Sequence, residues 1–192
     1  MDNTFSIIST VIKNRRSIKA QMMNGKRIPD YQVHSLLELA DWAPTHGYTE
    51  PWRFTVYSAP AEFCHQHAEL YKQNTAPADF VEGIYSNLYN QGNKVSHVIL
   101  VSMKRGNLPK IPVREETEAV ACAIQNVLLG ATALGIASFW STGGMAVKPP
   151  MKDFLKLGEH DHVAGIIYLG YAGEHPVGNR TVPLEEKITW IK

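Results

Sequence analysis

The segment "REETEAVACAIQNVLLGATAL" (residues 114–134) constrains the fold more than any other part of the chain. It begins with acidic residues, which suit the positive N-terminal end of a helix, and then becomes apolar on nearly every side. A helix of that kind cannot face water on one side, so it must be buried. We therefore predict a central helix in this segment, covered in part by a second copy of the chain.

The rest of the chain alternates between helical and strand patterns, with no repeat and no low-complexity linker. Apolar residues recur at helical spacing after Thr4 up to about Asn14, and again over residues 30–42. Strands are predicted at 53–58, 96–103, 136–141 and 163–172, with helical sequence between the first two and a short helix near 149–157. The C-terminal "VPLEEKITWIK" is left as an arm or an edge strand. The pattern predicts one α+β domain over residues 1–192, a sandwich of helices and sheet.

Composition excludes several classes of protein. The 192 residues are 44% apolar and carry a formal net charge of +1, so no bulk field would attract nucleic acid or an anionic membrane. Cys64 and Cys122 are too few for a disulfide framework and are interpreted as reduced thiols. No signal peptide and no membrane-spanning run is recognised, which indicates a cytoplasmic protein.

Common catalytic and nucleotide motifs are missing from the sequence. No strand pattern runs into G-x-G-x-x-G, nothing matches a P-loop, and no serine stands in a nucleophile elbow. "HQH" (65–67) and "HDH" (160–162) could place two imidazoles on one side of a strand, but the first lies in a helical pattern and the second in a loop. We favour solvated histidines there over a metal site.

Two polar segments are more informative. "NRRSIK" (14–19) offers forked donors, a hydroxyl and an ammonium to an oxyanion as the first helix closes, although basic residues also suit a helix C-terminus without any ligand. "WAPTHGYTEPWRF" (42–54) is rigid and polar, and could edge a planar heterocycle. Its alternative role is a helix-to-strand connection whose tryptophans fill the core, and for Trp52 we favour that role.

Taken in order, "NRRSIK", "ADWAPTHGYTEPWRF", "LGIASFWSTGG", "IIYLGYAGEHP" and "NRTVPLEE" resemble the signature of the FMN-dependent nitroreductase family, most closely its small bacterial NAD(P)H nitroreductases. The resemblance implies an α+β sandwich with a mixed or antiparallel central sheet and an intertwined homodimer. It also implies one FMN in each of two clefts lined by both subunits. There NAD(P)H reduces the flavin, and an electron-poor small molecule such as a nitroaromatic or quinone then takes the electrons.

The resemblance also implies roles for particular residues. It assigns the phosphate and ribityl groups of FMN to Arg15, Arg16, Ser17 and Arg180. It places Lys19 near the N1 and O2 edge of the flavin, where a cation would stabilise the reduced anion. The loop that approaches from the second subunit contributes Trp42 and His46, and the segment beside the isoalloxazine contains Trp140, Ser141 and Thr142. No residue is expected to act as an acid or base catalyst, because the flavin performs the hydride chemistry.

The chain departs from the family pattern in one place. Many members read Asn-x-Gln-Pro-Trp where this chain has Tyr48 and Glu50, so an amide near the flavin is lost. Glu50 would put a carboxylate near the cleft, with Arg53 as a possible partner, and we expect it to be structural. Two other functions stay open: a relative of the same fold that acts on one particular metabolite, and a protein that holds FMN without turnover.

Overall fold

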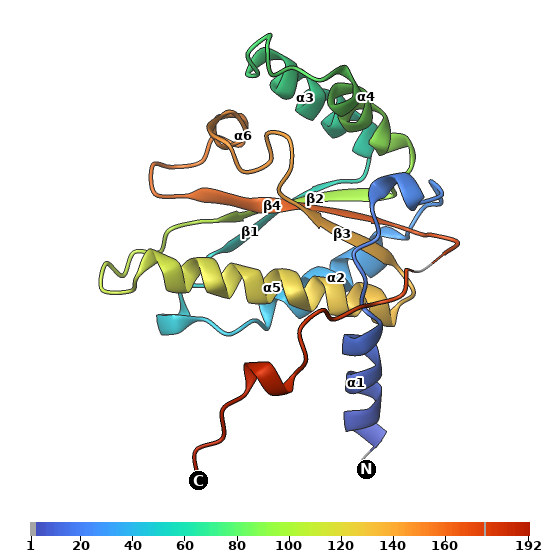
Figure 1. Cartoon of the computed structure of the whole chain (residues 1–192). Helices are drawn as coiled ribbons and strands as arrows, with labels where there is room; N and C mark the ends of the chain where they lie inside the picture. The colour runs from blue at the N-terminus through green and yellow to red at the C-terminus, as the bar shows by residue number, and fades with distance from the viewer. Residues whose placement is uncertain (1–2, 175) are drawn as a thin grey trace.

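The computed structural model describes residues 3–174 and 176–192, and its centre is a four-stranded antiparallel sheet (Figure 1). The strands follow the order β1-β2-β4-β3, with register pairs such as Thr55↔Leu100 and Ile99↔Ile167. Their bounds are β1 Trp52–Tyr57, β2 His97–Met103, β3 Ala137–Ser141 and β4 His162–Gly170. All seven residues of β2 are buried, as a central strand requires. The predicted α+β fold with an antiparallel sheet is confirmed.

Helices cover both faces of the sheet (Figure 1). One face carries α2 (Asp30–Asp41) and α5 (Val113–Ala133), and the other carries α3 (Pro60–Gln73), α4 (Glu82–Asn90) and α6 (Pro149–Phe154). Short 3-10 turns are η1 Ala20–Met22, η2 His46–Tyr48, η3 Gln91–Asn93 and η4 Glu185–Lys187. Because side chains alternate along a strand, Ile99 and Val101 of β2 pack toward α5 while Val98 and Leu100 pack toward α3.

Helix α5 is buried on the side that faces the sheet and α2, where Val120, Ile124 and Val127 are inaccessible. Its outer face, with Glu118, Cys122 and Gln125, is exposed within the single chain. The prediction of a central helix therefore holds for its position. Within one chain, however, α5 is not buried on all sides.

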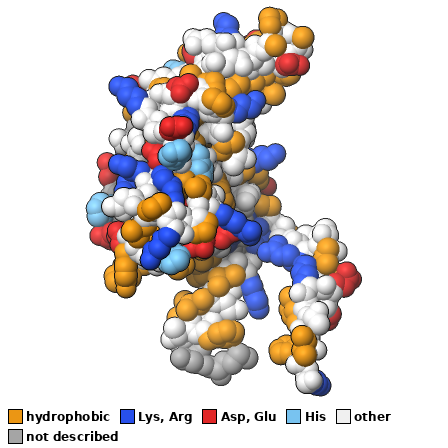
Figure 2. Space-filling view, turned by 90° about the vertical axis from the view of Figure 1, so that its left-hand side faces the viewer, with side chains coloured by type: hydrophobic (Ala, Val, Ile, Leu, Met, Phe, Trp, Pro, Cys, Tyr) orange, Lys and Arg blue, Asp and Glu red, His pale blue; other side chains and the backbone are white. Residues whose placement is uncertain are grey.

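Two segments project from the body of the molecule: α1 (Asn3–Asn14) and the C-terminal arm (Figures 1 and 2). Helix α1 has no buried residue, and it already includes Thr4. The arm after residue 176 contains only the turn η4 and, among the described residues, joins no strand. Apolar side chains on both segments face outward, notably Phe5, Ile8, Leu184, Trp190 and Ile191. The alternative of an arm is therefore the one observed.

Candidate functional site

The segment after α1 lies along β3. The backbone N–H of Ile18 donates to the carbonyl of Ser138 at 2.9 Å, and Ser17 forms a parallel bridge with Ser138. This places residues 15–19 beside the strand that leads to Trp140 and Ser141. Two segments that the sequence associates with one ligand are thus neighbours.

Arg16 joins the two ends of the chain. Its Nη1 donates to the carbonyls of Lys13 and Arg15, both at 2.7 Å, and its Nε donates to the carbonyl of Pro176 at 3.1 Å. Gly178 lies directly against the guanidinium, where a Cβ atom would collide. Arg16 is predicted as a phosphate ligand, but these N–H groups donate to backbone carbonyls. Its side chain therefore holds the C-terminal segment against the N-terminal one.

Three other predicted cations remain available nearby. Within residues 3–174 and 176–192, neither the Arg15 guanidinium nor the Lys19 ammonium has a polar partner, and Arg180 bonds only to the carbonyl of Asn179, at 2.9 Å. Because Arg16 draws residues 176–178 toward Arg15, Arg180 follows close by in the chain. Positive groups without carboxylate partners can neutralise an anion from outside the chain.

The end of β3 is the third part of this region. Trp140 Nε1 donates to the carbonyl of Ala164 at 3.1 Å, and its indole covers Gly165, whose φ of 143° suits glycine. The Ser141 hydroxyl accepts from the N–H of Gly143 at 3.3 Å, and Thr142 is exposed. The Trp140 ring is therefore held in one orientation by its own chain.

The loop after α2 has an unusual backbone. Gly47, Tyr48 and Glu50 all have positive φ angles, of 62°, 54° and 42°, which is costly for the two residues that carry side chains. The side chains of Trp42 and Tyr48 are 86% and 90% exposed. A strained loop that exposes two aromatic rings is typical of a functional surface.

Trp52 and Arg53 anchor the far side of this loop. Trp52 is buried and donates through Nε1 to Asp41 at 2.9 Å, which confirms its predicted core role. The sequence suggested Arg53 as a partner for the Glu50 carboxylate. Arg53 donates instead to the backbone carbonyls of Glu50 and Trp52, at 2.8 and 2.6 Å, and the Glu50 side chain is exposed.

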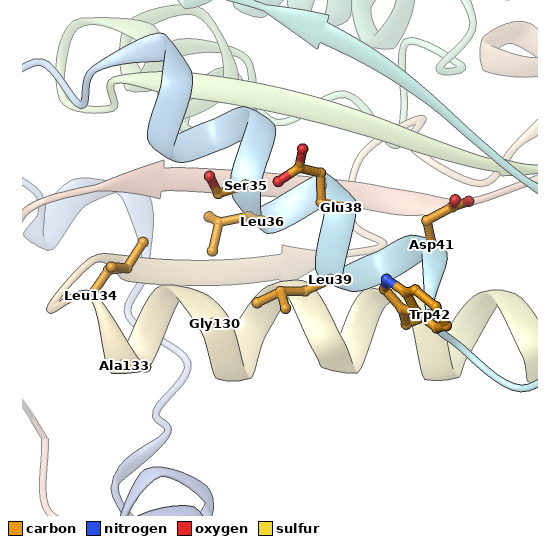
Figure 3. Close-up of a pocket in the computed structure, with 9 residues that line it drawn as sticks. All are labelled: Ser35, Leu36, Glu38, Leu39, Asp41, Trp42, Gly130, Ala133 and Leu134. Carbon is orange, nitrogen blue, oxygen red and sulfur yellow. The ribbon is translucent and has the colours of Figure 1, made fainter.

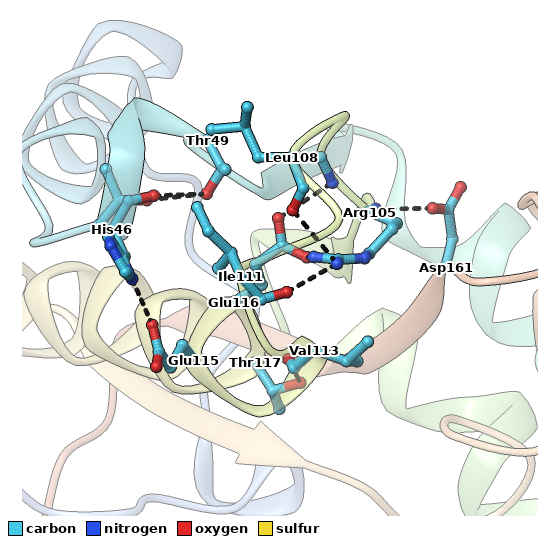
Figure 4. A network of polar contacts seen from close by, with 12 residues as sticks. His46, Thr49, Arg105, Leu108, Ile111, Val113, Glu115, Glu116, Thr117 and Asp161 are labelled. Atoms are coloured by element: carbon cyan, nitrogen blue, oxygen red, sulfur yellow. Dashed lines mark hydrogen bonds and ion pairs between the residues drawn. The ribbon is translucent and has the colours of Figure 1, made fainter.

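Beneath the loop lies a buried ion pair, which Figure 4 shows from close by. Arg105 Nη1 pairs with the carboxylate of Glu116, whose side chain is only 1% exposed, and Arg105 Nη2 donates to the carbonyl of Ile111 at 2.6 Å. The N–H of Gly106 donates to Glu116 Oε1 at 3.0 Å, and a Cβ on Gly106 would lie 2.9 Å from Thr49 Cγ2. The pair therefore supports the loop through Gly106.

A second contact fixes the loop from the side of α5. His46 Nδ1 lies 2.6 Å from Glu115 Oε2, in the first turn of that helix. Sequence analysis named His46 but missed Arg105 and Glu116. The available signal was an acid, Glu116, at a position that faces the core side of an otherwise apolar helix.

A hollow of about 600 Å³ lies between α2 and α5 and has Trp42 on its rim (Figure 3). A neighbouring hollow of about 420 Å³ shares Trp42 and also includes Tyr48 and Glu50. Neither is lined by Arg15 or Lys19. The exposed indole of Trp42 therefore lines two depressions that do not include these cations.

Two of the predicted site residues, His46 and Ser17, lie at opposite ends of α5, whereas Trp42 lines a hollow together with Gly130 and Ala133 of that helix. His46 contacts the first turn of the helix, whereas Ser17 pairs with Ser138, five residues beyond its last residue, Ala133. A helix of 21 residues is about 30 Å long. One chain alone does not bring His46 and Ser17 together.

The histidine-rich segments are dispersed. His65 stacks on Tyr89 with ring centroids 3.9 Å apart, while His67 points toward the backbone of Met145. The described residues contain no group of three or more His, Cys, Asp or Glu side chains arranged to hold a metal ion. No helix within those residues is both long and apolar enough to cross a bilayer.

Comparison with known proteins gives consistent matches over most of the chain. The model of the Nitroreductase family matches residues 12–171. A Bacillus subtilis protein named "Putative NAD(P)H nitroreductase YfhC" is 27% identical over 187 residues, covering 96% of this chain and 94% of the relative.

Solved structures show the same fold. A nitroreductase-like family protein from Bacillus cereus has a TM-score of 0.82 and 25% identity, with 96% of each chain covered. A Bacteroides fragilis nitroreductase solved with bound FMN has a TM-score of 0.69 and 24% identity, covering 96% of this chain and 98% of that one. The fold, the order of the segments and the extent of the family match lead to one conclusion: this chain belongs to the nitroreductase family.

Proposed function

We propose that the protein is a homodimeric FMN-dependent oxidoreductase that takes hydride from NAD(P)H and reduces electron-poor small molecules such as nitroaromatics and quinones. The observation that carries this proposal is the meeting of the N-terminal segment, β3 and the C-terminal segment near cations that have no carboxylate partner among the described residues. Membership of the family and the FMN in the B. fragilis structure point in the same direction.

The residues present fit a phosphorylated flavin. The forked donors of Arg15 and Arg180 suit the oxygens of a phosphate dianion, and the Ser17 side chain, two residues after Arg15, is exposed. When bound, FMN supplies the hydride acceptor and donor that the chain lacks. Lys19 holds a positive charge in the same segment, and Trp140 presents a fixed aromatic surface.

A second copy of the chain would complete the site. His46 lies at the other end of α5 from the segment that contains Arg15, so in our proposal the loop with Trp42 and His46 reaches the cations of the partner subunit. The exposed apolar faces of α1 and the C-terminal arm support this arrangement, since large unpartnered apolar surfaces are rare on monomers.

An absorbance spectrum of the purified protein before and after anaerobic NADPH tests the proposed activity. A flavin spectrum that bleaches with NADPH, and recovers when a quinone is added, is the expected result. A flavin that binds but does not bleach with NADPH or NADH would favour a carrier. Protein that neither contains nor takes up FMN would contradict the proposal.

The proposed dimer is tested separately. Light scattering at low micromolar concentration should give twice the chain mass, and Ile8→Glu, which places a charge on the apolar face of α1, should shift the protein toward monomer. Lys13→Glu is the matched control, because Lys13 is a polar, exposed residue of the same helix. A flavin-bound monomer in the unaltered protein would rule out the two-subunit site.

We also propose that the protein works in the cytoplasm. Cys64 and Cys122 are both free thiols, which suits a reducing compartment, and NAD(P)H is the proposed electron donor there. Localisation of a tagged chain would test this.

A further inference from the structure

His67 of α3 is a buried histidine that no part of the proposed activity uses. Its side chain is 1% exposed and faces the turn that follows β3. We propose that His67 is a positioning residue that holds this turn, residues 141–146, as a fixed wall of the flavin site. The proposal rests on the proposed function, because the resemblance is what places Ser141 and Thr142 beside the flavin ring.

The contact is a single hydrogen bond to the backbone. His67 Nε2 accepts from the N–H of Met145 at 3.1 Å. Among the described residues, it is the hydrogen bond that joins the backbone of 143–146 to α3. The other backbone groups of the turn bond elsewhere: the N–H of Gly143 donates to Ser141, the N–H of Ala146 donates to Gly143, and the carbonyl of Met145 accepts from Lys148. The position of the turn relative to α3 therefore depends on this acceptor.

The shape of the turn matches the imidazole ring. Gly144 has a φ of 62°, and a Cβ at this residue would lie only 2.9 Å from His67 Nε2. Glycine is thus needed both for the backbone conformation and for the close approach of the ring. The turn and the histidine fit each other as one unit.

The other ring nitrogen indicates why a histidine stands here. Because Nε2 accepts, the neutral ring carries its proton on Nδ1, which is buried and has no partner within the described part of the chain. Leaving a buried donor unpaired is costly, and an apolar residue would avoid that cost. Burial lowers the pKa of His67 to about 4, so Nε2 stays available as an acceptor at neutral pH.

The turn has a buried part and an exposed part. Met145 and Ala146 are buried in the core next to α3, whereas Thr142 and Gly143 are exposed. The exposed part is joined to β3 by the hydrogen bond from the N–H of Gly143 to the hydroxyl of Ser141. Holding Met145 therefore fixes where the exposed backbone of 142–143 lies, which is the part that a flavin ring would meet.

Two substitutions separate the acceptor from the packing. His67→Met keeps similar bulk but removes the acceptor, and His67→Gln offers an amide oxygen near the place of Nε2. Cys64→Ala is the matched control, because Cys64 is buried in the same helix and its thiol interacts with the backbone of Gly92, outside the turn. If His67→Met does not fold, His67→Asn replaces it, since its shorter amide does not reach Met145.

Amide hydrogen exchange of residues 142–146 is the primary measurement, made on each protein as purified and again with saturating FMN. We expect exchange at least ten-fold faster in His67→Met, near wild type in His67→Gln, and unchanged in Cys64→Ala. The dissociation constant of FMN should rise at least five-fold in His67→Met and recover in His67→Gln.

The two proposals fail in different ways. Unchanged exchange in His67→Met, or His67→Gln that behaves like His67→Met, overturns the role of His67 whether or not flavin binds. Faster exchange with an unchanged FMN dissociation constant overturns the link between the turn and the flavin. If the wild type takes up no FMN, the proposed function fails, and with it this role of the turn.

Discussion

The two ends of α5 differ in how their charges are satisfied. At the N-terminal end, Arg105 pairs with Glu116 and His46 with Glu115, so the loop after α2 is fixed by partners from its own chain. At the C-terminal end, Arg15 and Lys19 have no such partners in the described residues. The first end is thus a preformed frame, whereas the second leaves cations available to the ligand that we propose.

The largest loss of stability is expected when the Arg105–Glu116 pair at the N-terminal end of α5 is broken. Glu116→Leu leaves Arg105 without its carboxylate, and unpairing a buried charge should lower the free energy of unfolding by about 3–5 kcal/mol. Urea unfolding measures the loss. The double variant Arg105→Met/Glu116→Leu should recover much of it, and Glu118→Gln, in an exposed pair with Arg114, should change nothing measurable. A loss below about 1 kcal/mol for Glu116→Leu would show that the pair is not a support.

Arg15→Ala tests the opposite end. Removal of a guanidinium that meets the FMN phosphate should cost about 2–5 kcal/mol of FMN affinity and leave riboflavin, which has no phosphate, nearly unaffected. Fluorescence titration with both ligands measures the difference, with Lys13→Ala as a control for general positive charge on α1. Equal losses for FMN and riboflavin would remove Arg15 from the phosphate site.

The pH dependence of the free energy of unfolding tests whether the turn after β3 is preformed, like the loop after α2. The pKa of His67 is about 4 in the folded protein, below the usual 6.5, because burial disfavours the charged ring. Between these values the unfolded chain binds a proton that the folded chain does not, so stability is lost as pH falls. The expected loss from pH 7 to pH 5 is about 2 kcal/mol.

The contribution of His67 is isolated by difference. Burial also lowers the pKa values of His97 and His162, which add losses of the same sign. The wild-type profile from urea unfolding is therefore compared with that of His67→Gln, which should be flatter. Parallel profiles would mean that His67 is accessible to protons in the folded protein.

The smallest effect is expected for Lys19→Met. A positive charge near the flavin favours the reduced anion, so its removal should lower the midpoint potential of bound FMN by about 30 mV, or about 1.4 kcal/mol for two electrons. Spectroelectrochemistry measures the potential, and Lys26→Met serves as an exposed control in the same part of the chain. An unchanged potential at full FMN occupancy would exclude Lys19 from the site.

Periodicity in the sequence was sufficient to predict the elements. The helix expected at 30–42 is observed as Asp30–Asp41, and the apolar run 96–103 becomes the fully buried β2. These predictions hold because the local spacing of apolar residues indicates the burial of one helix face or of a whole strand. The ordered motifs likewise predicted the family.

What the sequence did not reveal depends on contacts between distant segments. The role of Arg16 requires Pro176, and that of His67 requires Met145, and neither partner is identifiable without the fold. Glu116 was read only as an acid suited to a helix N-terminus, although its carboxylate points inward to Arg105. A local pattern cannot distinguish an acid that faces water from one that faces a buried guanidinium.

The length of α5 sets the distance between the two halves of each proposed site. In a symmetric pair of chains, the loop of one copy meets the cations of the other only if this helix has the right number of turns. An insertion of four residues in α5 would lengthen it by roughly 6 Å and shift both sites at once. Insertions between α3 and α4 change neither spacing. Helix α5 is therefore where this architecture should tolerate changes in chain length least.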